Sequence, residues 1–224
     1  MGCISVYLCS RMETKKRFFE IVHASFDTHG YAWASGYGPL EESSMKFLHP
    51  SQLERNREYW KINNETPGLH IDPGGEGWPD FLGCGFMPPS FFVSEKVISS
   101  LQHESITFAR ATAIPIGDVA SKALKLSSSP KYFVLEASQG MEIDYLKSGI
   151  PTDSLGKPIL SPLPKPWPPA MWWFKLASWT GADLFGWPSL DQRTSTRLLC
   201  TERIVELAER DGWTNVKFNS IGVS

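Results

Sequence analysis

One pattern of hydrophobic and polar positions occurs twice in this chain, 107 residues apart. The phrase VSEKVI at 93–98 returns as CTERIV at 200–205. In each copy a hydroxyl residue, Ser94 or Thr201, precedes an acidic residue, which is a typical order of residues at a helix N-terminus. The pattern therefore predicts two equivalent helices, each capped by its hydroxyl side chain.

The residues that follow each predicted cap indicate how the two helices pack. Two adjacent apolar residues in each copy are expected to face one sheet, and a strand is expected after each helix, at 106–116 and 216–221. The basic residues Lys96 and Arg203 are expected to lie over the apolar face with their charged groups in water. The apolar pairs are Val97 with Ile98 and Ile204 with Val205.

Other short segments have the composition of strands. Residues 17–24 are rich in aromatic and β-branched residues, and 132–137 and 141–145 are predicted to form a hairpin. A further strand is predicted at 172–176, and a short helix at 51–60. Strands mostly in hairpin order, with a few helices, predict an α+β fold built mainly on antiparallel sheet.

Proline and glycine indicate where the chain divides. Residues 67–89 are rich in both, which favours a variable N-terminal subdomain at 1–78 and an α+β core at 79–224, although one continuous domain also fits. A second proline-rich stretch at 151–169 contains seven of the 17 prolines, so it is expected to be extended.

Charge and cysteine content exclude several classes of function. With 22 basic and 24 acidic residues the net charge is −2, so no nucleic-acid partner is expected. No segment has the length and hydrophobicity of a membrane span. Four scattered cysteines, with no CxxC pair, predict no zinc site and no cofactor, and they favour a cytoplasmic protein with reduced thiols.

Cys84 is the candidate nucleophile, because it lies between Gly83 and Gly85 and is preceded by His70 and Asp72. A catalytic cysteine needs an adjacent base, and a sequence does not show that His70 reaches Cys84. A small buried thiol in a tight turn is the favoured interpretation. No motif of a hydrolase, a nucleotide-binding protein or a metalloenzyme occurs, so no catalytic residue is assigned.

Tryptophan is unusually frequent, with nine residues, and five of them lie between 167 and 187. Tryptophan is enriched at protein interfaces, and it also fills irregular cores. A proline-rich segment is stiff before binding, so an exposed aromatic residue there would lose little entropy on docking, and both uses remain open. The predicted partner-binding residues are Trp167, Trp179 and Trp187.

Four stretches of the chain resemble a known family: 78–85 (WPDFLGCG), 92–97 (FVSEKV), 181–185 (GADLF) and, most specifically, 199–218 (LCTERIVELAERDGWTNVKF). They are similar to the bacterial toxin-immunity proteins named for a double CxxCG motif, which are abundant in myxobacteria. The cysteine pairs that name the family are missing here, so a metal site is not carried over.

The resemblance implies a cytoplasmic immunity protein that neutralises a cognate polymorphic toxin by stoichiometric binding, and such a role requires no catalytic residues. Two alternatives remain open: a small hydrolase that uses Cys84, and a regulatory binding module without a toxin partner. The sequence does not determine the oligomeric state.

Overall fold

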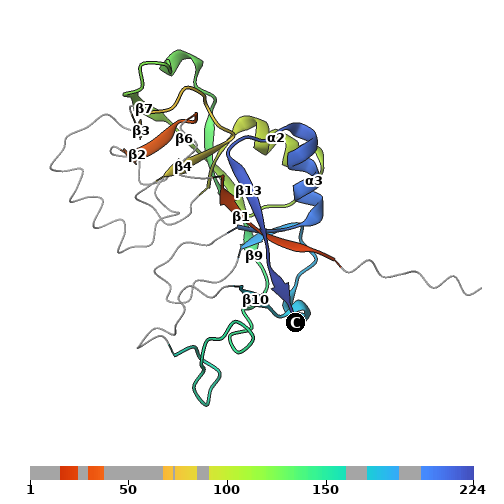
Figure 1. The fold of residues 1–224 in the computed structure, drawn as a ribbon. Helices are drawn as coiled ribbons and strands as arrows, with labels where there is room; N and C mark the ends of the chain where they lie inside the picture. The colour runs from red at the N-terminus through yellow and green to blue at the C-terminus, as the bar shows by residue number, and fades with distance from the viewer. Residues whose placement is uncertain are drawn as a thin grey trace, which may run out of the picture.

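The computed structural model describes residues 16–24, 30–37, 68–72, 74–84, 91–159, 171–186 and 198–224. Within them the chain forms two large, mostly antiparallel sheets and two α-helices (Figure 1), which confirms the predicted α+β fold. The helix predicted at 51–60 lies outside the described residues. No helix in the described part is long and apolar enough to cross a membrane.

The first sheet has seven strands in the order β6-β8-β5-β4-β2-β3-β7, and the helix α2 (Glu95–His103) follows β5. Its strands in chain order are β2 (Trp33–Tyr37), β3 (Leu69–Ile71), β4 (Phe81–Cys84), β5 (Phe91–Ser94), β6 (Arg110–Ile114), β7 (Ile116–Val119) and β8 (Tyr132–Glu136). A short 3-10 helix, η1 (Leu126–Ser128), precedes β8.

The second sheet has five strands in the order β13-β1-β12-β11-β9, and the helix α3 (Glu202–Asp211) follows β12. Its strands are β1 (Phe18–His23), β9 (Ser138–Gln139), β11 (Leu184–Gly186), β12 (Leu198–Thr201) and β13 (Val216–Ser220). A separate parallel pair joins β10 (Trp173–Phe174) to β14 (Gly222–Val223), and the 3-10 helix η2 (Leu176–Ser178) follows β10.

The repeat in the sequence is one part of a duplication of the whole fold. The hairpin β4-β5 followed by α2 and β6 is repeated as the hairpin β11-β12 followed by α3 and β13. The parallel strand pairs are repeated as well. The pair β2-β4 corresponds to the pair β9-β11, and the pair β3-β7 corresponds to the pair β10-β14. Elements β1 to β7 and β8 to β14 are therefore two copies of one unit.

The two copies exchange their first strands. β1, the first strand of the first copy, lies between β12 and β13 of the second, where Phe18 is opposite Thr201. β8, the first strand of the second copy, lies between β5 and β6 of the first, where Tyr132 is opposite Ser94. The segment predicted as an N-terminal subdomain thus contributes β1 to the C-terminal sheet, and the copies are interlocked.

The core lies in three clusters that follow from this arrangement. The central cluster contains residues of both helices and both sheets, including Val97, Leu101, Ile204 and Leu207, and Figure 1 shows α2 and α3 side by side. A second cluster covers the other side of the first sheet, and a third surrounds Phe174 and Phe185. The helices meet in the shared core while each lies on its own sheet, so the prediction of one common sheet was wrong.

Several predicted strands are shorter or paired differently. The strand at 17–24 is confirmed as β1, whereas those at 106–116 and 172–176 reduce to β6 and β10. The hairpin of 132–137 with 141–145 was wrong: β9 pairs in parallel with β11, and Ile143 forms a single antiparallel bridge to Phe174.

Candidate functional site

The start of α2 is built around a buried carboxylate, Asp80, at the entry to β4. Ser94 Oγ donates a hydrogen bond of 2.7 Å to Asp80 Oδ1, and Lys96 Nζ donates one of 3.0 Å to Oδ2. The backbone amide and the hydroxyl of Thr214, in the other copy, donate to the same Oδ2 at 3.0 and 3.1 Å. Asp80 therefore binds the N-terminus of α2 and links the two copies.

The same cluster occurs at the start of α3. Thr201 Oγ1 donates to Asp183 Oδ1 at 2.6 Å, and Arg203 Nη1 donates to Asp183 Oδ2 at 2.8 Å. In both copies the aspartate carbonyl also accepts the backbone amide of the hydroxyl residue, at 2.8 Å from Ser94 and 2.9 Å from Thr201. The duplication thus includes an aspartate, a hydroxyl residue and a basic residue in equivalent positions.

These clusters correct two predictions. Ser94 and Thr201 occupy the N-cap positions, as predicted, but neither side chain makes a capping hydrogen bond, because each hydroxyl donates to its aspartate. The basic residues do not simply extend into water: Lys96 Nζ donates to the carbonyl of Gly212 at 2.9 Å, and Arg203 Nη2 donates to that of Glu104 at 2.7 Å. Each cation therefore reaches the C-terminal end of the other helix, where the helix dipole favours positive charge.

The acidic residue of each repeated phrase holds the exchanged strand. The Glu95 amide donates to the carbonyl of Lys131 at 2.9 Å, and the two side chains form an ion pair at 3.4 Å. In the other copy the Glu202 amide donates to the carbonyl of Arg17 at 3.2 Å, and their side chains also pair. The repeated phrase is therefore the structural junction of each helix with its neighbouring strands.

Sequence reasoning missed Asp80 and Asp183, although a signal was present. Each is followed by two large apolar residues and a glycine, as DFLG at 80–83 and DLFG at 183–186, so the repeat extends into the preceding strand. Glu95 and Glu202 are one matched pair of acids in the repeat, and Asp80 and Asp183 are a second. Recognising this second pair would have indicated the partners of the hydroxyl residues and of the basic residues.

His70 lies on β3, and its Nδ1 pairs with Asp118 Oδ1 on β7. Of Cys84 the structure describes only the backbone, opposite Ala34 on β2. Cys200 is a free thiol buried in the central core, and burial raises its pKa well above the usual value. Among the described residues no group of three His, Cys, Asp or Glu side chains is placed to hold a metal ion.

Of the three tryptophans predicted to bind a partner, Trp179 is described, and Trp167 and Trp187 lie outside the described residues. The Trp179 ring packs edge-on against Phe18 at 5.2 Å between centroids, and its Nε1 donates to the carbonyl of Ala182 at 2.9 Å. The ammonium of Lys16 lies 4.1 Å from the ring centroid. Trp179 is therefore half-buried and held at the start of β1.

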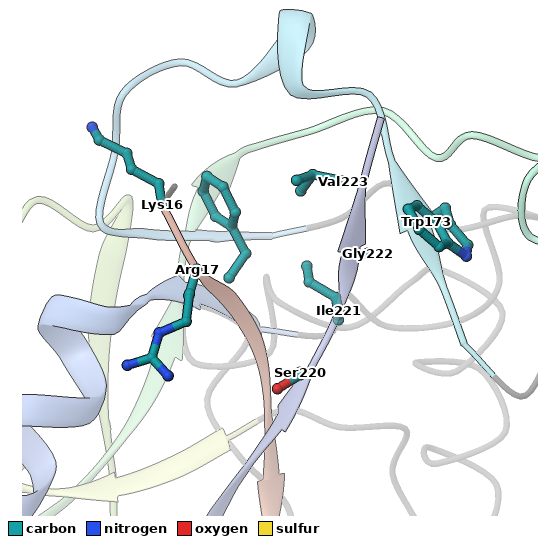
Figure 2. Close-up of a pocket in the computed structure, with 8 residues that line it drawn as sticks. Lys16, Arg17, Trp173, Ser220, Ile221, Gly222 and Val223 are labelled. Carbon is teal, nitrogen blue, oxygen red and sulfur yellow. The ribbon is translucent and has the colours of Figure 1, made fainter. Parts of the chain in front are cut away.

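A cavity of about 380 Å³ opens where the start of β1 meets the C-terminal strand β14 (Figure 2). Lys16 and Arg17 extend in different directions at one side, while Trp173 lies across β14. A side chain at Gly222 would come within 2.5 Å of the Trp173 ring, so only glycine permits this contact. The lining residues are Lys16, Arg17, Phe18, Trp173, Ser220, Ile221, Gly222 and Val223.

The lining of this cavity suits binding rather than acid-base chemistry. Its walls are aromatic and aliphatic, with two cationic side chains at the rim, and none of the described lining residues carries a carboxylate, an imidazole or a thiol. Such a surface fits an apolar group, because Arg17 already pairs with Glu202 and the Lys16 ammonium lies over the Trp179 ring.

Comparison of the chain with known protein families and with curated protein sequences found no match.

Proposed function

We propose that this chain is an immunity protein, which binds a cognate bacterial toxin and neutralises it by stoichiometric contact. The resemblance of four stretches to the double-CxxCG immunity proteins suggests the role. The structure of the most specific stretch, 199–218, bears on how such a protein would work, because it forms β12, α3 and β13.

The observation that carries the proposal is the use of the polar residues of the repeated motif. Asp80, Ser94 and Lys96 bond to one another and to the other copy, as do Asp183, Thr201 and Arg203. In both copies these polar groups therefore join the helix start to the preceding hairpin and to the other copy. The motif accordingly builds a rigid scaffold, and function is left to the surface that the scaffold presents.

A protein that acts by occupying its partner needs preformed anchors, and the region around Trp179 offers them. Its indole is fixed by Phe18 and by the carbonyl of Ala182, so little side-chain entropy is lost on binding. Trp179, together with Trp167 and Trp187, is proposed to supply part of the contact with the partner. The proposed partner is a protein in the cytoplasm, without nucleic acid or membrane.

Co-expression with a candidate toxin, chosen because its gene lies beside that of this chain, tests the proposal. Cells that express the toxin alone should lose viability, whereas cells that also express this chain should survive, and the two proteins should co-purify. A catalytically inactive toxin controls for expression burden. Rescue without any physical complex would contradict neutralisation by binding.

The hydrolase alternative requires His70 to act on Cys84, but β2 lies between the strands that carry them, β3 and β4. Asp118 pairs with His70, and a carboxylate that orients a histidine is one half of the arrangement that activates a cysteine nucleophile. In that case Cys84→Ala should abolish rescue while the melting temperature and toxin binding stay unchanged. The immunity proposal expects Cys84→Ala to rescue like the wild type.

A further inference from the structure

The exchange of first strands between the two copies is reciprocal. In the first sheet β8 lies next to the terminal strand β6, and in the second sheet β1 lies next to the terminal strand β13. The registers also correspond, because Tyr132 is opposite Ser94, Phe18 is opposite Thr201, and these two hydroxyl residues are the equivalent N-caps of α2 and α3. Each copy therefore gives the same strand to the same place in the other, as the subunits of a strand-exchanged homodimer do.

Each exchanged strand is buried in the copy that receives it. Phe18 and Ile21 of β1 are each 2% exposed, and Tyr132 and Val134 of β8 are each 1% exposed. Both strands are paired along both edges, β1 with β12 and β13, and β8 with β5 and β6. A copy without its received strand would have two unpaired strand edges and an open hydrophobic core. Neither copy therefore has a complete sheet of its own.

Buried polar groups cross between the copies in both directions. The Tyr132 hydroxyl of the second copy donates a hydrogen bond of 2.6 Å to the carbonyl of Pro79 in the first. The Asn215 side-chain amide donates one of 2.7 Å to the carbonyl of Phe81. A buried donor or acceptor that loses its partner is costly, so these bonds also oppose separation of the copies.

The covalent link between the copies, residues 120–131, contrasts with this buried surface. Its first part belongs to the first copy, because Leu124 is buried in the core cluster of the first sheet and the Ser121 hydroxyl donates to the carbonyl of Gly75 at 2.9 Å. Residues 125–128 are then exposed around η1. The exposed part of the link therefore adds little to the packing that joins the copies.

We propose that the surface between the copies is a binding surface in its own right, and that its partner is a second unit of the same kind. The two copies then behave as the subunits of a dimer, and the link at 125–128 is not needed to hold them together. The shared core around Val97, Leu101, Ile204 and Leu207 has the hydrophobic character of obligate dimer interfaces. This inference is independent of the proposed immunity function, which concerns a different partner.

Cleavage of the full chain between the copies tests the proposal. A protease recognition sequence is inserted between Ser127 and Ser128, which are both exposed, and the uncut variant is the matched control. The uncut variant should melt like the wild type. After cleavage, the halves 1–127 and 128–224 should elute together in gel filtration, at the position of the intact chain, at a concentration of about 1 μM.

The concentration dependence of urea unfolding gives the sharper readout. Unfolding of the uncut variant produces one chain from one chain, so its midpoint should not depend on protein concentration. Unfolding of the cleaved protein should separate two chains in a single transition, so its midpoint should rise by about 1 M urea for a hundredfold increase in concentration. The amides of β1 and β8 should remain protected from hydrogen exchange after cleavage, as in the uncut variant.

Three results would overturn the proposal. Halves that elute separately, each with its own cooperative unfolding, would show that a copy folds without the other's strand. Unfolding or precipitation on cleavage would show that the link is required. A midpoint that does not depend on concentration, or loss of protection in β1 or β8, would show that the exchanged strands do not join the halves. If the insertion itself lowers the melting temperature, the same site between Lys122 and Ala123, also exposed, replaces it.

Discussion

Asp80→Ala should be among the most destabilising single substitutions in this chain. The Asp80 side chain accepts hydrogen bonds from Ser94, Lys96 and twice from Thr214, and the residue is only 8% exposed. Its removal leaves the buried Ser94 hydroxyl and the Thr214 amide without that acceptor. A buried polar group that loses its partner costs about 1–3 kcal/mol, so the expected loss in unfolding free energy is about 3–5 kcal/mol.

The duplication supplies the comparison. Asp183 occupies the equivalent position and binds Thr201 and Arg203, and within the described residues it has no link like that to Thr214. Its side chain is 26% exposed, against 11% for the side chain of Asp80. Asp183→Ala should therefore cost less, about 1–2 kcal/mol. Glu206→Ala, on the exposed side of α3, should change stability by less than about 0.5 kcal/mol and serves as the control.

Urea unfolding followed by tryptophan fluorescence measures these differences, and equal slopes against urea concentration would show that the transitions are comparable. A loss of less than about 1 kcal/mol for Asp80→Ala would refute the reasoning, because removing a buried carboxylate that accepts four hydrogen bonds is expected to cost more than that. An equal or larger loss for Asp183→Ala would also refute it, since the bonds to Thr214 would then contribute nothing.

Three further predictions concern pH, packing and partner contact. Burial lowers the pKa of His23 from 6.5 to about 4, so the unfolded chain binds more protons than the folded chain between these pH values. The unfolding free energy should therefore fall by up to about 3 kcal/mol as the pH drops from 6.5 to 4. In urea unfolding, His23→Gln should lack this part of the pH dependence. Gly222→Ala should lower the melting temperature, because the new methyl group would meet the Trp173 ring at 2.5 Å; an unchanged melting temperature would contradict that packing. Trp179→Ala should weaken toxin binding about thirtyfold if the indole is a contact anchor, whereas a melting-temperature loss with unchanged binding would place it in the core alone.

The sequence predicted the helices well because their signal is local. A hydroxyl residue, an acid and two apolar residues located the N-termini of α2 and α3 at Ser94 and Thr201. The partners of those hydroxyls were not predictable in the same way. Asp80 and Asp183 lie 14 and 18 residues earlier in the chain, and only the β4-β5 and β11-β12 hairpins bring them to the helix starts.

The exchange of β1 and β8 illustrates what composition leaves open. Aromatic and β-branched residues indicate that 17–24 forms a strand but not which strand lies beside it, and β1 pairs with the distant strands β12 and β13. Gly140 gave a second misleading signal: its glycine suggested a hairpin turn. In the fold a side chain there would approach Phe185 within 2.4 Å, so the glycine is required by packing against β11.

For the candidate site, composition drew attention to the tryptophans, because they are unusual in number and position. The exposed leucines between residues 141 and 159 gave no comparable signal. Leu146 and Leu155 are common residues in a mixed polar sequence, and their exposure follows from the turns that Asp144 and Asp153 organise. Exposure is a tertiary property, and it required the fold.

Titration of toxin activity with the purified chain tests the central claim, neutralisation by stoichiometric binding, most directly. With the toxin at a concentration well above the Kd, activity should fall linearly with added protein and reach zero at one equivalent, without any change in the mass of either chain. Complete inactivation by a small fraction of an equivalent would show that the protein acts catalytically and would contradict the account.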